Sequence, residues 1–95
     1  MMQTIKVSGS NNKHQVLVYA ISTCGWCKRA KKFLKDNNVQ YEYVDIDLIN
    51  NDDKKRIKKD ITNRGGLLAY PTLIIDGKIL LTGAPQDKLK EILEL

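Results

Sequence analysis

The chain has 95 residues, a length that supports one hydrophobic core rather than two. Its 42% hydrophobic and 28% charged content excludes a disordered polymer, and two cysteines are too few for a disulfide-rich scaffold. Sixteen Lys and Arg residues against 11 Asp and Glu residues give a formal charge of +5. Because the basic residues are dispersed and aromatic residues are few, this charge favours a solvated surface over a nucleic-acid interface.

The sequence shows neither a membrane-spanning run nor a secretory signal. Its longest clear apolar run covers residues 16–21, whereas a membrane span takes about 20 residues. Residues 1–15 are polar and lack the apolar segment of a signal peptide. His14 is the only histidine, so four ligands for a structural zinc ion are missing. We therefore expect one cytoplasmic, monomeric domain over residues 1–95, without a metal site and without a membrane or nucleic-acid partner.

The first elements in chain order are predicted to be strands. Residues 1–14 form an N-terminal extension that holds a short extra strand near residues 4–7 and then a polar loop. Residues 16–21 are a continuous apolar run rich in β-branched side chains, which is typical of a strand buried on both faces.

A helix and a second buried strand follow this run. From residue 24 the apolar side chains recur with helical spacing while lysines occupy the other side, and residues 36–38 end the pattern. Residues 41–47 alternate in the manner of a strand. A strand, a helix of about a dozen residues and another strand predict a right-handed crossover between parallel strands.

The rest of the chain predicts a helix, a hairpin and a last helix. Asn50 or Asn51 can cap the helix that precedes Gly65 and Gly66. Strands at residues 72–75 and 78–81 are joined by Asp76-Gly77, which is a strong hairpin signal. A last helix begins near Pro85. The whole order predicts a mixed sheet with helices on both faces.

The most informative segment is residues 22–29, which read Ser-Thr-Cys-Gly-Trp-Cys-Lys-Arg. Cys24 stands where the predicted helix begins, so unpaired N–H groups and the helix dipole favour its thiolate. Lys28 and Arg29 are candidates for lowering the pKa of Cys24 further if their side chains reach back. Cys27 comes one turn later, close enough to form a disulfide with Cys24 but more enclosed.

This asymmetry predicts thiol–disulfide exchange. Cys24 attacks a substrate disulfide and Cys27 resolves the mixed disulfide, which leaves a Cys24–Cys27 disulfide as the redox-active group without any bound cofactor. Gly25 keeps the turn open and Trp26 offers an apolar surface, so both are candidate substrate contacts. Two ordinary core cysteines or half of a metal site are the alternatives, and the position between a strand and a helix disfavours them.

The second signal is Tyr70-Pro71-Thr72. Pro71 directly precedes a predicted strand, where its missing N–H is tolerated. The general preference of X–Pro bonds is trans, but a cis bond here would bring the backbone of Tyr70 beside Cys24. We therefore include Tyr70, Pro71 and Thr72 among the candidate substrate-binding residues.

These segments resemble the thioredoxin superfamily, and most closely the glutaredoxins and glutaredoxin-like thioredoxins. The matching stretches are residues 16–31, 43–47 and 70–72. The resemblance implies a thioredoxin-like α/β fold with a central four-stranded mixed sheet flanked by three helices. It also implies a cis bond before Pro71, and attacking and resolving roles for Cys24 and Cys27.

Several positions differ from the usual glutaredoxin pattern. Ile21 stands where glutaredoxins often carry a lysine for glutathione, Ala69-Tyr70 replaces Thr-Val, and only Gly83 remains of a Gly-Gly pair, as a candidate contact. These differences argue against glutathione. The pattern is similar to bacterial and archaeal glutaredoxin-like proteins that are reduced like thioredoxins, some of which supply ribonucleotide reductase.

The resemblance therefore implies a protein-disulfide reductase that receives electrons from an upstream enzyme of the thioredoxin-reductase type. Its partners would be disulfide-containing proteins, with ribonucleotide reductase as one candidate. Two alternatives keep the fold and change the function: a glutathione-dependent glutaredoxin, and a carrier of a [2Fe–2S] cluster.

Overall fold

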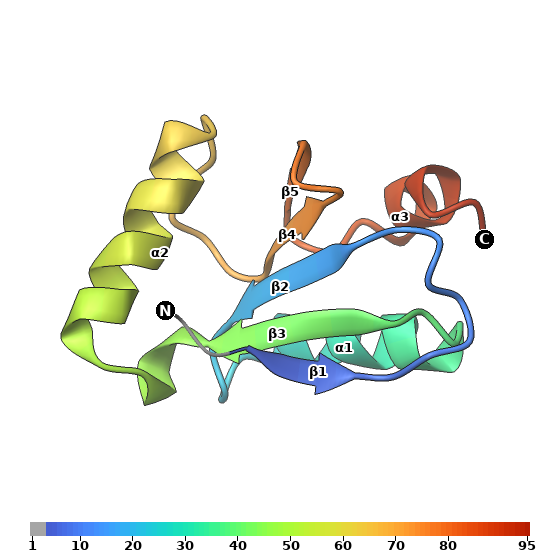
Figure 1. Ribbon diagram of the computed structural model, residues 1–95, viewed down its shortest axis with the longest axis horizontal. Helices are drawn as coiled ribbons and strands as arrows, with labels where there is room; N and C mark the ends of the chain where they lie inside the picture. The colour runs from blue at the N-terminus through green and yellow to red at the C-terminus, as the bar shows by residue number, and fades with distance from the viewer. Residues whose placement is uncertain (1–3) are drawn as a thin grey trace.

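The computed structural model describes residues 4–95, so the first three residues of the expected N-terminal extension lie outside it (Figure 1). The elements follow the predicted order, with one added 3-10 turn. They are β1 (Ile5–Val7), β2 (Val16–Ala20), α1 (Gly25–Asp36), β3 (Tyr41–Asp45), η1 (Ile46–Leu48), α2 (Asn51–Asn63), β4 (Thr72–Ile75), β5 (Ile79–Thr82) and α3 (Gln86–Ile92).

The strands form one mixed sheet in the order β1-β3-β2-β4-β5, so the sheet has five strands where four were expected. β2 and β3 are parallel, with Tyr19 opposite Val44, as the helical crossover between them requires. β4 runs antiparallel to β2, and β5 antiparallel to β4. The fifth strand is β1, the short strand expected in the N-terminal extension, which pairs antiparallel with β3 at the sheet edge.

Helices cover both faces of this sheet, and each face has its own core. On one face the strands pack against α1 and α3, whose Leu34 and Leu89 are fully buried. On the other face they pack against α2 through Ile57 and Ile61. Figure 1 shows α2 and α3 at opposite ends of the view, with the sheet between them. β2, whose sequence is apolar at every position, is therefore buried on both faces of the sheet, as predicted.

The helix starts are capped by side chains that the sequence offered. Asn50 caps α2, because its side-chain oxygen accepts a hydrogen bond from the Asp53 N–H at 2.8 Å. Cys24 occupies the same position before α1, and its sulfur accepts a hydrogen bond from the Cys27 N–H at 3.3 Å. Among residues 4–95, no helix is both long and apolar enough to cross a membrane.

Several strand boundaries differ from the prediction by one or two residues, and the largest difference is at the end of β3. β3 ends at Asp45, and the alternating residues that follow it turn into η1, where Asp47 accepts a hydrogen bond from the Ser22 N–H at 2.9 Å. That bond draws the chain out of the sheet and toward the segment before Cys24. A side-chain contact between distant segments thus outweighed the local alternation.

The hairpin turn is one residue longer than predicted. Asp76 and Gly77 both have left-handed backbone angles, with φ of 55° and 66°. The Lys78 N–H then bonds to the Ile75 carbonyl at 3.1 Å, and Ile75 pairs with Ile79 in the ladder. Lys78 therefore belongs to the turn, and β5 starts and ends one residue later than residues 78–81.

Candidate active site

Cys24 lies at the end of the segment that connects β2 to α1. The chain turns after Ala20, and the Cys24 N–H bonds to the Ile21 carbonyl at 3.0 Å. Cys24 has extended backbone angles, with φ of −79° and ψ of 121°, and its carbonyl accepts the first helical hydrogen bond from Lys28 at 3.1 Å. Its partly exposed sulfur is therefore held at the positive end of α1.

Cys27 is one turn further along and fully buried. It belongs to the core on the α1 side, together with Ala20 and Leu34. Both cysteines are thiols in this structure. A partner disulfide approaching from solvent can reach Cys24, whereas Cys27 can be reached only through Cys24.

The two thiols differ in acidity as well as in access. Burial by itself would raise the pKa of Cys24, but hydrogen bonds from the Cys27 thiol and from the Cys27 and Trp26 N–H groups, with the charge of Lys31, outweigh it. The net pKa of Cys24 is lowered. Burial, followed by the hydrogen bond to Cys24, raises the pKa of Cys27. The thiolate therefore forms on Cys24.

A turn from the other half of the chain completes the site. The Tyr70–Pro71 bond is cis, as the family resemblance implied. The Tyr70 carbonyl oxygen lies 4.0 Å from the Cys24 sulfur. The Gly83 N–H donates to the Pro71 carbonyl at 2.7 Å, which brings the segment between β5 and α3 to the same place. Three segments far apart in sequence thus meet around Cys24.

Thr72 does not serve as a substrate contact through its side chain. It is fully buried, and its hydroxyl donates to the Ala69 carbonyl at 2.6 Å. Its side chain is shielded from a substrate because Thr72 is the first residue of a strand whose four side chains are all buried. Its hydroxyl instead stabilises the turn that presents Tyr70. Pro71 is also buried, and its carbonyl accepts the hydrogen bond from Gly83.

A small cavity lies beside Trp26, at the start of α1. Trp26 is 66% exposed, and the Arg29 guanidinium lies 5.0 Å from the centre of its ring. These two side chains, with Phe33, Ala84 and Gln86, line a cavity of about 230 Å³. Gly25 is exposed beside them, and a side chain there would meet nothing within 4 Å.

The loop before Pro71 is also uncharged and apolar. Residues 65–72 contain no charged side chain. Leu67 and Leu68 are 70% and 52% exposed, three and two residues before Tyr70. Sequence reasoning did not single out this pair, although two adjacent leucines in a loop after Gly-Gly were a usable signal.

The charge that acts on the cysteines does not come from the candidates chosen by sequence. Lys28 and Arg29 are exposed on the outer side of α1, and Arg29 is engaged with Trp26. The charge that lowers the pKa of Cys24 is that of Lys31, which was missed. Its only signal in the sequence was a position four residues after Cys27.

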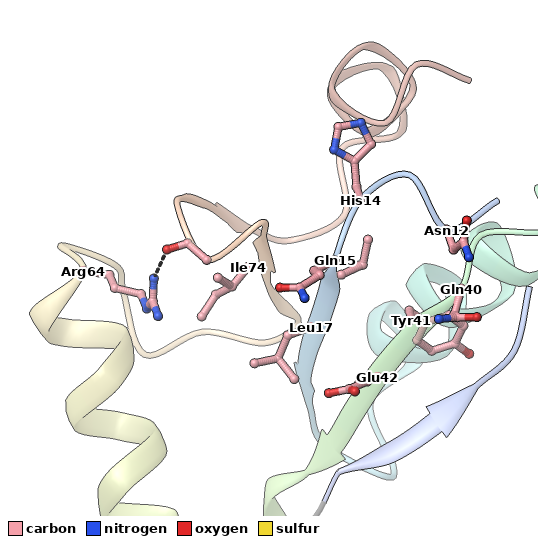
Figure 2. A pocket seen from close by; sticks show the side chains of 11 residues that line it. Asn12, His14, Gln15, Leu17, Gln40, Tyr41, Glu42, Arg64 and Ile74 are labelled. Carbon is pink, nitrogen blue, oxygen red and sulfur yellow. Dashed lines mark hydrogen bonds between the residues drawn. The ribbon is translucent and has the colours of Figure 1, made fainter.

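A second cavity, larger than the one beside Trp26, lies away from the cysteines. A cavity of about 450 Å³ opens on the sheet beside His14, Leu17 and Glu42, and at its edge Arg64 donates to the Gly77 carbonyl at 2.7 Å (Figure 2). None of its lining residues belongs to the segments around Cys24. Within residues 4–95, no group of three or more His, Cys, Asp and Glu side chains is arranged to hold a metal ion.

Comparison with known proteins decides the family. The sequence profile of the glutaredoxin family matches residues 16–80, which include Cys24, Cys27 and the Tyr70–Pro71 turn. The chain belongs to the glutaredoxin family. Family membership makes it a thiol–disulfide oxidoreductase.

Relatives by sequence include both short and longer glutaredoxins. An uncharacterized glutaredoxin-like 8.6 kDa protein in a rubredoxin operon of Clostridium pasteurianum is 30% identical over 78 residues, covering 80% of this chain and 97% of the relative. Glutaredoxin 1 of Rickettsia conorii is 30% identical over 63 residues, covering 66% of this chain and 59% of the relative. The match to this second relative therefore spans about three fifths of its length.

Solved structures share the whole fold. A glutaredoxin from Methanosarcina mazei Go1 superposes with a TM-score of 0.88 and 28% identity, covering 99% of this chain and 90% of the other. Methanoredoxin from Methanosarcina acetivorans gives a TM-score of 0.87 and 30% identity, covering 99% and 97%. The expected thioredoxin-like fold with three flanking helices is confirmed, with five strands instead of four.

Proposed function

We propose that this glutaredoxin reduces disulfide bonds in partner proteins through a dithiol cycle. The observation that carries the proposal is the contrast between its two thiols. Cys24 is accessible and has a lowered pKa, whereas Cys27 is buried and has a raised pKa. A reactive thiolate in front of a protected thiol is the arrangement that such a cycle needs.

The cycle runs in two exchange steps. The Cys24 thiolate attacks one sulfur of the partner disulfide, a mixed disulfide forms, and the other sulfur leaves as a thiolate that takes a proton from solvent. Cys27 then gives up its proton and attacks the Cys24 sulfur, which releases the second partner thiol. Two electrons pass to the partner, and the Cys24–Cys27 disulfide remains as the redox-active group, with no further cofactor required.

The segments around Cys24 support an extended polypeptide as the substrate. The Tyr70 carbonyl faces the Cys24 sulfur, and the backbone around it can pair with a passing peptide strand. Gly25 leaves room above the helix start, Trp26 provides an apolar contact, and Gly83 borders the opposite side. We assign these four residues to substrate binding, with Pro71 holding Tyr70 in position.

The surface favours a protein reductant over glutathione. Glutathione is a small peptide with two carboxylates, and the uncharged loop of residues 65–72 offers it no cation. Arg64, just before that loop, is engaged with Asp60 at 2.8 Å and with the Gly77 carbonyl. The exposed leucines of the loop suit an apolar protein surface instead. We propose an enzyme of the thioredoxin-reductase type as the electron source.

The proposed recipients are disulfide-containing proteins, with ribonucleotide reductase as a candidate because of the family resemblance. A cycle that depends on continuous enzymatic reduction works in a reducing compartment, so we propose the cytoplasm as its location.

The deciding experiment starts from the oxidised protein. It is incubated separately with excess glutathione and with NADPH plus a thioredoxin reductase, quenched with an alkylating agent, and analysed by mass. We expect rapid reduction by the enzyme and slow reduction by glutathione. Rapid reduction by glutathione, with a glutathione adduct on Cys24, would contradict the proposed reductant. Failure to form a Cys24–Cys27 disulfide on oxidation would contradict the dithiol cycle itself.

A further inference from the structure

A partly buried ion pair lies between α1 and the end of β3. Lys31 Nζ is 2.9 Å from Asp45 Oδ1, and the two side chains are only 20% and 13% exposed. The Lys31 ammonium also lies 3.9 Å from the centre of the Tyr43 ring. Among the ion pairs of the described residues, this one is the most enclosed. Since enclosing two charges costs solvation, a gain in stability does not explain it.

Two independent observations place the ion pair on the side of the molecule that carries the cysteines. Lys31 follows Cys27 by four residues, so the two share a face of α1, and helical side chains lean toward the N-terminus. On the strand side, Asp45 is the ladder partner of Ala20, four residues before Cys24. Ala20 and Cys27 belong to the same core cluster. Both observations place the Lys31 ammonium on the Cys27 side of α1, beside the end of β3 that pairs with Ala20.

Arg29 and Lys32, two other cations of α1, are exposed to solvent, unlike Lys31. Arg29 is exposed and stacks on Trp26, and Lys32 is exposed and pairs with Asp36 at 2.6 Å one turn later. Solvent screens charges at such places. The charge of Lys31 is less screened, and it acts to lower the pKa of both cysteines.

We propose that Lys31 is a positioning residue for the thiol chemistry and that Asp45 is its anchor. Asp45 holds the ammonium on the Cys27 side of α1 and limits how much positive charge acts on the cysteines. The inference rests on the proposed role of Cys24 as the attacking thiol.

The two members of the pair have opposite effects on the Cys24 thiolate. Without the Lys31 charge, the Asp45 carboxylate is left unpaired near the thiols and disfavours a second anion. Without the Asp45 charge, the ammonium is uncompensated and favours the thiolate more strongly. Removal of both charges gives an intermediate result. If the ion pair were only a structural contact, removing Lys31 and removing Asp45 would not shift the pKa of Cys24 in opposite directions.

The other titratable groups near the pair do not change their charge where Cys24 titrates. The Tyr43 ring faces the ammonium from β3. Burial raises the pKa of Cys27 and of Tyr70, so both stay protonated in neutral solution. Hydrogen bonds from Ser22 lower the pKa of Asp47, which stays charged. The thiol that loses its proton first at the site as the pH rises is therefore that of Cys24.

The test is the pH dependence of thiol alkylation in the reduced protein, with the labelled cysteine identified by mass. We expect Lys31→Met to raise the midpoint by about 0.5 to 1 pH unit, which slows alkylation below the midpoint by about three- to tenfold. Asp45→Asn should lower the midpoint, and the double variant should lie between the two. The matched control is Lys32→Met, which removes the neighbouring charge from the exposed side of α1 and should leave the midpoint unchanged.

Three results would overturn the inference. The first is an equal shift in Lys31→Met and Lys32→Met, which would mean that the charge acts diffusely through solvent. The second is an unchanged midpoint in folded Asp45→Asn, which also decides the case if Lys31→Met fails to fold. The third is faster labelling of Cys27 than of Cys24, which would overturn the proposed cysteine roles as well. Labelling of Cys24 with unchanged midpoints would leave those roles intact.

Discussion

The two ends of the central strand β2 carry opposite kinds of surface. Beyond its last residue lies the cysteine end, where the exposed Trp26 follows Cys24 and the uncharged loop of residues 65–72 leads into the Tyr70–Pro71 turn. Before its first residue lies the histidine end, where His14 Nδ1 is 2.7 Å from Asp76 and Nε2 is 3.2 Å from Glu94. The ionic contacts there join three segments of the chain, while the pKa of the Cys24 thiol, which burial alone would raise, is lowered by the Cys27 thiol, by backbone N–H groups and by one cation.

This difference teaches that the charges of a small basic protein need not gather at its reactive site. At the histidine end, the cluster fastens the C-terminal residues to the turn after β4, and Asp76 also accepts from the Gln15 N–H at 2.8 Å. At the cysteine end, few charges leave a surface that an apolar protein can cover. Variants at the two ends should therefore separate stability from reactivity.

The largest expected effect is at the cysteines themselves. Cys24→Ser should reduce disulfide exchange to background, because no other accessible thiol remains. Cys27→Ser should keep the first attack and accumulate a mixed disulfide on Cys24, visible by mass after incubation with a protein disulfide. His14→Gln, at the histidine end, is the control and should keep turnover. Loss of the first attack in Cys27→Ser but not in Cys24→Ser would reverse the two roles.

The next effect compares two glycines, one at each end. In Gly9→Ala the added Cβ would collide with the Asn38 carbonyl oxygen and lie 2.6 Å from the Gln40 nitrogen. We expect a loss of about 1 to 3 kcal/mol in the free energy of unfolding, measured by denaturant titration. In Gly25→Ala the Cβ meets nothing within 4 Å, so the free energy should be unchanged or higher. Equal losses in both variants would contradict the difference in packing.

A smaller effect concerns recognition. The double substitution Leu67→Ser and Leu68→Ser should raise KM for a protein disulfide by about five- to tenfold, since about 1 kcal/mol of apolar contact is lost. Exchange with a small disulfide should be unaffected. Ile79→Ser, which changes an exposed apolar side chain on β5, is the matched control. A similar rise in KM in this control would show that the contact is not specific to the cysteine end.

The smallest effect is the pH dependence of stability at the histidine end. Hydrogen bonds to Asp76 and Glu94 raise the pKa of His14 above 6.5. Because the folded state favours protonated His14, this stabilisation is complete below pH 6.5 and is lost as the pH rises through the folded pKa. The Tm difference between the wild type and His14→Gln should therefore shrink from about pH 6 to about pH 9. A difference that grows with pH would contradict the assignment.

The same cluster has a second limit on the acid side. The hydrogen bond from His14 lowers the pKa of Asp76 below 3.8, so the contribution of Asp76 is present above that value and lost as the pH falls through its folded pKa. Both charges are in place between these limits, where we expect the contribution of the cluster to Tm to be greatest.

Much of the fold could be predicted because its signals are local. An apolar β-branched run became β2, Asn50 capped α2, and Asp76-Gly77 formed the turn after β4. Each of these depends on a few neighbouring residues and their backbone preferences. The Cys24–Cys27 spacing at a strand–helix junction is equally local, and it was enough to indicate thiol–disulfide chemistry.

Predictions that depended on distant contacts were less accurate. Thr72 was expected to touch a substrate, but its hydroxyl is used by the Ala69 carbonyl inside the fold. β3 was expected to continue to residue 47, but the bond between Asp47 and Ser22 ends it earlier. In each case the competing partner lies on another segment, which no pattern within one element reveals.

The sequence by itself determined the order of the elements and the position of two cysteines at the start of a helix, since both follow from periodicity, capping and turn chemistry. Only the tertiary structure decided which cation acts on that pair. Lys28, Arg29 and Lys31 are equivalent in charge and lie within four residues of one another. The register of β3 beside β2 places Asp45 under α1, and this carboxylate holds the Lys31 ammonium on the Cys27 side of α1.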